Sequence, residues 1–268
     1  MRLHGFDVTA TTLARLLGRP WVTSVYAFPP QAALLSEPDE RVKVVPVAFE
    51  TRRFSPAPGK DRRLVIRTGA TLPTKDIGFF FAAAKRLPEF HFLFVGVTAK
   101  NLEGYVDESR ELAAATGSPV ELRFDVPAAE AAKLISRAAI HLHTANPTGS
   151  IDARPFGMPV SIAEGMATGF YTVARDTREF REFVGDAGSF YSDLDEAERL
   201  IRATLAWTDE NWRAVQRRSI DRAYAHFADE LVLRTIFEDW QKIADALKAE
   251  ESDDACPRET QALAAEAV

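Results

Sequence analysis

The chain has 268 residues, of which 46% are hydrophobic and 27% charged, a composition typical of a globular protein. The net charge of −6 argues against a general nucleic-acid binder, because neutralising phosphates requires a basic surface. The one cysteine, Cys256, excludes an internal disulfide and a cysteine-rich metal site, which favours a cytoplasmic location. The sequence has no signal-peptide core and no apolar run long enough to span a membrane, so any membrane contact is expected to be peripheral.

Short runs rich in β-branched or aromatic residues are predicted to be buried strands. In chain order they cover residues 21–27, 42–49, 63–69, 90–97, 120–126, 139–145 and 170–176. Helical patterns separate most of them, at residues 78–87, 107–116, 128–137, 161–168, 177–184 and 194–207. This alternation predicts an α/β fold with a doubly wound parallel sheet, Rossmann-like, from about Leu64 onward. Such sheets bind ligands at the carboxyl ends of their strands.

The stretch "ETRRFSPAPGKDRR", residues 50–63, is rich in proline and charge and is predicted to be a linker. One helix and two strands precede it, too little to close a sheet with its own core. A long helical stretch follows the sheet, with a predicted break near His226 and Phe227. We therefore expect the end of an acceptor-side domain and linker at 1–55, a ligand-binding domain at 56–228, a C-terminal helix at 229–248 and a disordered polar tail at 249–268.

The stretch "PVSIAEGMATG" is predicted to begin a helix, and it has two interpretations. Ser161 and Glu164 fit a capping box, in which each side chain bonds the backbone amide of the other residue. The same helix end presents amides and partial positive charge that suit a phosphate, while its carboxylate suits two vicinal ribose hydroxyls. The two roles are compatible, since the capping carboxylate can exchange an amide for a ligand.

A lysine follows the first strand of the predicted sheet. In "RTGATLPTKDIGFFF" the strand ends at Gly69, and Lys75 comes just before a helix, where a diphosphate would lie. The alternative is an ordinary solvated lysine in a loop. The stretch is neither a Walker loop nor G-x-G-x-x-G, so a dinucleotide dehydrogenase has little support.

Other motifs favour no further chemistry. His141 and His143 share one face of a strand, but no third ligand has zinc-site spacing, so they are predicted to be polar residues at the rim of the site. No G-x-S-x-G elbow supports a serine hydrolase. Asp193 and Asp195 are predicted to cap the helix that follows them.

Three stretches, in order, resemble the glycosyltransferase group 1 family, the retaining GT-B glycosyltransferases. "VKVVPVAFETRRFSP" resembles the interdomain strand and linker pattern "vipnGvDtxxFxP", and "VIRTGATLPTKDIGFFFAAAKRLPEFHFLFVG" resembles the first two strands of the donor-binding domain. "PVSIAEGMATGFYTVARDTREFREFVGDAGSFY" resembles the signature "G(I/L)xxxEAMAxGxPVvaxxxxxxxExvxxxxxG". The similarity runs from about Val22 to Trp240.

The resemblance implies sugar transfer from a nucleoside diphosphate sugar to an unknown acceptor, with retention of configuration and without a metal ion or other cofactor. Lys75 matches the lysine that contacts the diphosphate, and Glu164 matches the glutamate that binds the ribose, so these two are the candidate catalytic residues. The further candidate donor-binding residues are Gly69, Thr71, Phe156, Gly157, Met158, Pro159, Val160, Ser161 and Ile162.

Two positions depart from the family pattern. Ala70 replaces the arginine that usually follows the strand-end glycine, which makes the nearby Arg67 a candidate phosphate clamp. Phe156 stands where the family has its first glutamate; in a second register, with two extra loop residues, Arg154 falls beside that place. Asp152 is the nearest acid. One alternative is therefore a catalytically silent donor-binding domain that acts with a separate acceptor-domain partner. A sugar-nucleotide epimerase on the same architecture ranks lower, because no pair of acid and base residues stands out.

Overall fold

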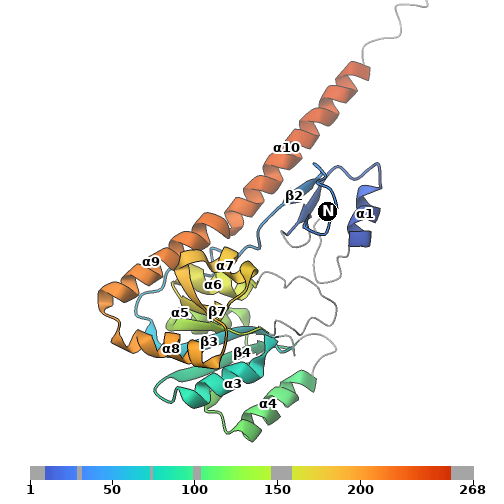
Figure 1. Cartoon of the computed structure of the whole chain (residues 1–268). Coiled ribbons are helices and arrows are strands. Elements are labelled where there is room, and N and C mark those ends of the chain that lie inside the picture. Colours follow the sequence, from blue (N-terminus) through green and yellow to red (C-terminus); the bar gives the residue numbers. More distant parts are fainter. Residues whose placement is uncertain (1–9, 29–31, 73–74, 99–103, 146–158, 255–268) are drawn as a thin grey trace, which may run out of the picture.

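The computed structural model describes residues 10–28, 32–72, 75–98, 104–145 and 159–254. Its main body is a six-stranded parallel sheet flanked by helices (Figure 1). The strands are β3 (Asp61–Ala70), β4 (His91–Val97), β5 (Val120–Phe124), β6 (Ala138–His143), β7 (Tyr171–Arg175) and β8 (Gly188–Tyr191), in the spatial order β5-β4-β3-β6-β7-β8. This confirms the predicted doubly wound parallel sheet, and it adds β8, which the sequence patterns missed because it is short and begins with Gly-Ser.

Helices cover both faces of this sheet (Figure 1). One apolar cluster joins the strands to α3 (Ile77–Arg86) and α8 (Leu194–Ala203), with α4 (Gly104–Thr116) packed against α3. The other cluster joins the opposite face to α5 (Ala128–Arg137), α6 (Val160–Thr168) and α7 (Arg178–Val184). The central strands of the sheet are therefore buried on both faces. This explains why their sequences are continuous apolar runs and do not alternate between apolar and polar residues.

Helix α6 packs against the following strand more closely than a side chain at Gly165 would allow. A Cβ atom built on Gly165 would lie 1.9 Å from the ring of Phe170, which is fully buried between α6 and β7. The helix ends at Gly169, whose φ of +91° is a conformation that glycine adopts without steric cost. These two glycines allow the C-terminal half of α6 to pack closely against the start of β7.

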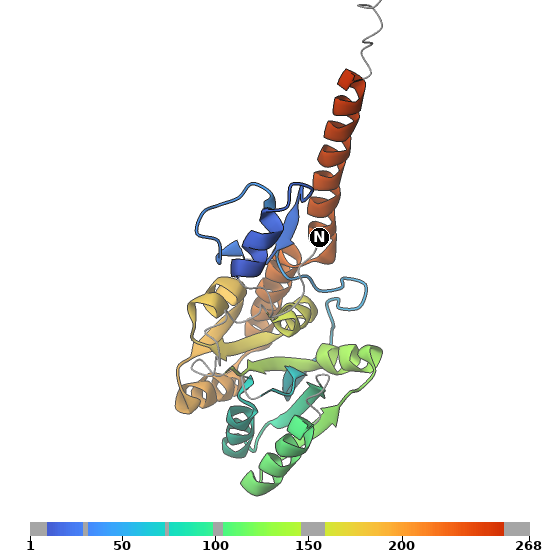
Figure 2. The ribbon, with the colours of Figure 1, turned by 90° about the vertical axis from the view of Figure 1, so that its right-hand side faces the viewer.

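The N-terminal unit consists of α1 (Ala10–Leu17) and a two-stranded parallel sheet of β1 (Val25–Ala27) and β2 (Val42–Val44). The chain returns to it through α9 (Asp209–His226) and α10 (Asp229–Asp254), which runs past β2 and away from the main sheet (Figures 1 and 2). Ser24 and Tyr26 each donate a hydrogen bond of 2.7 Å to Asp239 of α10. The predicted break between the last two helices is confirmed at Phe227, and α10 continues to Asp254, beyond the expected end at residue 248.

Short connections complete the described chain. The 3-10 turns η2 (Gly185–Ala187) and η3 (Thr204–Ala206) follow α7 and α8, so the helix predicted for 194–207 ends earlier as an α-helix. Asp193 caps α8 as predicted, because its side chain accepts a hydrogen bond from the Glu196 amide at 2.8 Å. Within the described residues, no helix combines the length and the apolarity needed to cross a bilayer.

Candidate functional site

The sheet changes winding direction between β3 and β6. These two strands are hydrogen-bonded neighbours, yet the chain continues from β3 outward through β4 and from β6 in the opposite direction through β7. At such a point the two loops at the carboxyl ends diverge and leave a crevice, the usual ligand position in open α/β sheets. Here the loops start after Ala70 and after His143, and the second one includes residues 146–158, which lie outside the described residues.

A buried arginine joins the two loops. Arg67 is 1% exposed, and its Nε donates to Thr144 Oγ1 at 2.7 Å. Another nitrogen of its guanidinium donates to the carbonyl oxygens of Lys75 and Thr144 at 3.1 and 3.2 Å. Thr144 Oγ1 in turn donates to the same Lys75 carbonyl at 2.7 Å. The prediction of Arg67 as a phosphate clamp is therefore wrong: this guanidinium is buried against backbone carbonyls and positions Lys75.

Lys75 lies at the carboxyl edge of the sheet, as predicted, and it is not a fully solvated lysine. It is largely buried, and desolvation together with the charge of Arg67 lowers its pKa to about 8. Helix α3 follows directly, with Asp76 in a left-handed conformation as N-cap and its side chain accepting from the Phe79 amide. Because Lys75 and Arg67 are both cations, their charges together favour the binding of an anion at this edge of the sheet.

The turn before Lys75 is held by backbone and hydroxyl contacts. Thr71 is fully buried, and both its amide and its hydroxyl donate to the Val97 carbonyl at the end of β4. Its side chain therefore shapes the turn and does not face the crevice, contrary to the prediction that it binds the donor. Gly69 is partly exposed and has φ of +136°, so its backbone borders the crevice with no side chain in the way.

Helix α6 begins two residues earlier than the capping-box prediction requires. Its N-cap is Pro159, which makes no side-chain cap hydrogen bond, so Ser161 lies inside the first turn. The predicted capping box of Ser161 and Glu164 is therefore wrong. The reason is that Pro159 already adopts the extended conformation of an N-cap, and its carbonyl accepts from the Ile162 amide.

This register changes which amides are available for a ligand. Ile162 is fully buried and its amide bonds Pro159, so it cannot contact a donor as predicted. Val160 and Ser161 occupy the first two positions of the helix, where an α-helix supplies no backbone partner for its amides. The predicted donor-binding residues Phe156, Gly157 and Met158, and the neighbouring Asp152 and Arg154, lie outside the described residues.

Glu164 is mostly buried on α6, and burial raises its pKa to about 7. The charge of Arg53 opposes this increase, whereas the charge of Glu50 adds to it. These two linker residues form an ion pair of 3.1 Å. The sequence analysis did not predict that these two residues act on Glu164. Their spacing of three residues suggests an ion pair between them, but it carries no information about a helix more than a hundred residues away.

The two histidines lie in the interior of the protein. The prediction that they lie at the rim of the site is wrong. His141 is 0% and His143 3% exposed, on the face of β6 that packs against Phe170 and Phe180. Burial lowers the pKa of His141 to about 3, and that of His143 lies well below its usual value, so both are neutral. Within the described part of the chain, no group of three or more histidine, cysteine or acidic side chains could hold a metal ion.

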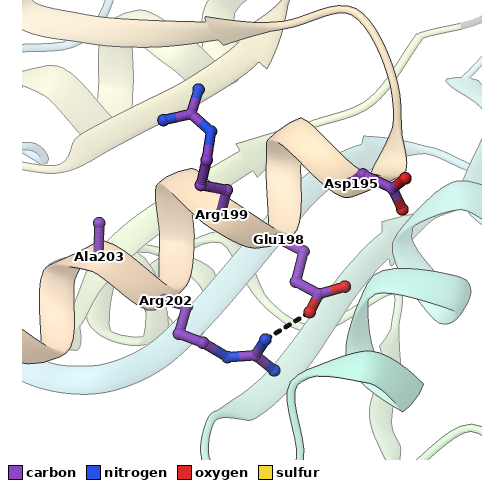
Figure 3. A pocket seen from close by; sticks show the side chains of 5 residues that line it. All are labelled: Asp195, Glu198, Arg199, Arg202 and Ala203. Carbon is purple, nitrogen blue, oxygen red and sulfur yellow. Dashed lines mark hydrogen bonds and ion pairs between the residues drawn. The ribbon is translucent and has the colours of Figure 1, made fainter.

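The surface hollow in Figure 3 is a different kind of feature. It measures about 500 Å³ and is lined by Asp195, Glu198, Arg199, Arg202 and Ala203 of α8. Its charged groups are partly exposed and paired: Arg202 bonds Glu198, and Arg86 of α3 bonds both Asp195 and Glu198. We interpret it as an ion-pair network that joins α3 to α8, because its charges already neutralise one another.

Comparisons with known proteins agree with this fold. The model of the family described as "Glycosyl transferase-like" matches residues 67–238. No curated protein sequence matches the chain. Among solved structures, Anabaena HepE in complex with UDP and glucose is 19% identical and aligns over 92% of this chain and 70% of its own, with a TM-score of 0.67.

Two further structures have similar folds. A glycosyltransferase from Rickettsia africae is 14% identical over 91% of this chain and 70% of its own, with a TM-score of 0.69. The pneumococcal O-GlcNAc transferase GtfA, in complex with UDP and GlcNAc, is 14% identical over 90% of this chain and 47% of its own, with a TM-score of 0.58. At these identities the likeness concerns the fold.

Proposed function

The chain belongs to the glycosyl transferase-like family, and from this premise we propose that it transfers a sugar from a nucleoside diphosphate sugar to an acceptor, with retention of anomeric configuration. The observation that carries the proposal is the switch in winding between β3 and β6, where the largely buried Lys75 follows β3 and the start of α6 follows β6. Anabaena HepE has been crystallised with UDP-glucose, which makes UDP-glucose the first donor to test.

Each proposed contact follows from the chemistry of the side chain. Lys75 and the amides of Val160 and Ser161 would bind the diphosphate, whose negative charge grows as the bond to the anomeric carbon breaks. Glu164, when ionised, would accept hydrogen bonds from both ribose hydroxyls. Arg67 does not contact the donor in this proposal; it holds the Lys75 carbonyl and so sets the position of the lysine.

Calorimetry with UDP-glucose tests the role of Glu164. At pH 8, where the carboxylate is ionised, Glu164→Gln should weaken binding roughly 10- to 100-fold, because a charged acceptor of two hydroxyls becomes a neutral amide. Glu179→Gln on α7 is the matched control, since Glu179 is exposed and outside the crevice. Equal affinities of the wild-type protein and Glu164→Gln would exclude the ribose contact.

A second candidate is a donor-binding domain without activity of its own, which acts with an acceptor-domain partner. The described N-terminal unit favours it, because Trp21 and Val44 there are 72% and 54% exposed and such apolar groups suit an interaction surface. Sugar transfer or donor hydrolysis by the purified chain alone would exclude this alternative.

A further inference from the structure

A fully buried threonine joins the two loops at the switch in winding between β3 and β6. Thr144 follows β6 directly and is 0% exposed. Its hydroxyl accepts a hydrogen bond from Arg67 Nε at 2.7 Å and donates one to the Lys75 carbonyl oxygen at 2.7 Å. A threonine hydroxyl has a single proton to donate, and here that proton is directed to the loop after β3. Thr144 therefore connects the end of β6 to the peptide group of Lys75.

The guanidinium that donates to this hydroxyl is held in one orientation. Arg67 lies over the ring of Phe94 on β4, with 5.6 Å from its guanidinium carbon to the ring centroid. Its two terminal nitrogens donate to the carbonyl oxygens of Thr68, Lys75 and Thr144. If the Thr144 hydroxyl were removed, Arg67 Nε would lose its acceptor in a buried position, which is unfavourable.

A second contact attaches the start of α3 to the end of β6 without the Thr144 hydroxyl. The Tyr191 hydroxyl donates to the His143 carbonyl oxygen at 3.1 Å. The ring of Tyr191 stacks on Phe79 in the first turn of α3, with 4.8 Å between the ring centroids. Because this contact remains when the hydroxyl is removed, a substitution at Thr144 should act locally, on the peptide group of Lys75.

We propose that Thr144 is a positioning residue for the donor diphosphate: its hydroxyl holds the Lys75 peptide group against the end of β6 and so directs the Lys75 ammonium group to the diphosphate. The inference rests on the proposed function, since it takes Lys75 as the diphosphate contact. Thr144 does not touch the donor itself. Its hydroxyl matters because a charge-assisted hydrogen bond depends on the distance and angle at which the ammonium group is presented.

Exchange of Thr144 for valine and for serine tests this role by calorimetry with UDP-glucose. Thr144→Val keeps the shape of the side chain and removes the hydroxyl, so binding should weaken roughly 5- to 10-fold as the ammonium group is misplaced. Thr144→Ser keeps the hydroxyl, and its affinity should stay within about two-fold of that of the wild-type protein. A loss in Thr144→Ser as large as in Thr144→Val would contradict a role of the hydroxyl.

A matched control removes a buried threonine hydroxyl elsewhere. Thr204 in η3 is 3% exposed and donates its hydroxyl to the Ile201 carbonyl oxygen at 2.7 Å. Thr204→Val should lower the thermal midpoint and leave the affinity for UDP-glucose unchanged, because Thr204 belongs to neither of the two loops. Thr144→Cys, whose thiol is a weak donor, is the second variant if Thr144→Val does not fold, and it should bind UDP-glucose more weakly than Thr144→Ser.

A double-mutant comparison separates the positioning of Lys75 from a general structural role. In the Lys75→Met background, Thr144→Val should change the affinity by less than about two-fold, because the ammonium group that the hydroxyl positions is gone. A loss of roughly 5- to 10-fold in both backgrounds would overturn the proposal, since the hydroxyl would then act without Lys75.

The same variants distinguish a failure of this inference from a failure of the proposed function. If Lys75→Met binds UDP-glucose as tightly as the wild-type protein, Lys75 is not the diphosphate contact, and the proposed function loses that contact together with the role of Thr144. If Lys75→Met weakens binding and Thr144→Val does not, the proposed function stands and the positioning role is wrong.

Discussion

The two edges of the main sheet each bury a lysine, and the surroundings of the two lysines differ. Burial lowers the pKa of Lys60 to about 7 and that of Lys75 to about 8, so desolvation does not distinguish them. At the amino edge, Lys60 Nζ donates to the carbonyl oxygens of Ser136 and Ala138 and to Thr168 Oγ1, at 2.9 to 3.1 Å. Lys60 thus joins the ends of α5 and α6 to the start of β6.

At the carboxyl edge, the charges are arranged in another way. Lys75 lies beside the cation Arg67, whose guanidinium is directed to backbone carbonyls, and Glu164 on α6 is raised in pKa by its own burial. The charge of Arg67 adds to the desolvation of Lys75, whereas the pKa of Lys60 is lowered by desolvation alone. Burial of a charge by itself therefore does not identify a binding site.

Exchange of each lysine for methionine should give the largest contrast. Lys75→Met should weaken UDP-glucose binding roughly 10- to 100-fold, because a charge-assisted contact to the diphosphate is lost. Lys60→Met should leave the affinity within about two-fold and lower the thermal midpoint by roughly 5 °C, since buried carbonyls lose their donor. Calorimetry and thermal unfolding measure both effects. The distinction between the edges fails if both variants lose affinity equally.

A second effect is expected on stability at alkaline pH. The pKa of Glu164 rises from 4.5 to about 7 on folding, so its contribution is favourable below pH 4.5 and is lost as the pH rises toward 7. Glu164→Gln removes this loss. The difference in unfolding free energy between the variant and the wild-type protein should therefore shift in favour of the variant by up to about 3 kcal/mol from pH 4 to pH 8. Urea unfolding at both pH values checks this, with Glu179→Gln as control. A pH-independent difference would show that Glu164 is not desolvated.

The smallest effect is expected at the ion pairs beside the hollow on α8. Arg86 of α3 pairs with Asp195 and Glu198 on the surface, where solvent screens the interaction. Arg86→Ala should shift the thermal midpoint by no more than about 2 °C and leave UDP-glucose binding unchanged. A large loss of affinity in this variant would mean that the hollow on α8 takes part in binding.

The sequence by itself determined the order of the elements and the class of sheet. Strand and helix periodicities are local, so the apolar runs and the amphipathic stretches between them predict a parallel doubly wound sheet without tertiary information. The same order places Lys75 after β3 and Glu164 on α6 at the carboxyl edge, which the structure confirms. β8 escaped prediction because Gly188–Tyr191 is too short to show a periodicity.

Only the tertiary structure decided what each polar side chain contacts. Arg67 of β3 is buried against Thr144, 77 residues further along the chain, and the ring of His143 contacts Phe180 of a later helix. The position of the linker against α6 likewise depends on long-range packing, such as the hydrogen bond from the Ala57 amide to the Thr168 carbonyl. The physical reason is that desolvation and charge pairing depend on distances across the fold, whereas a sequence pattern reports the period of the chain along itself.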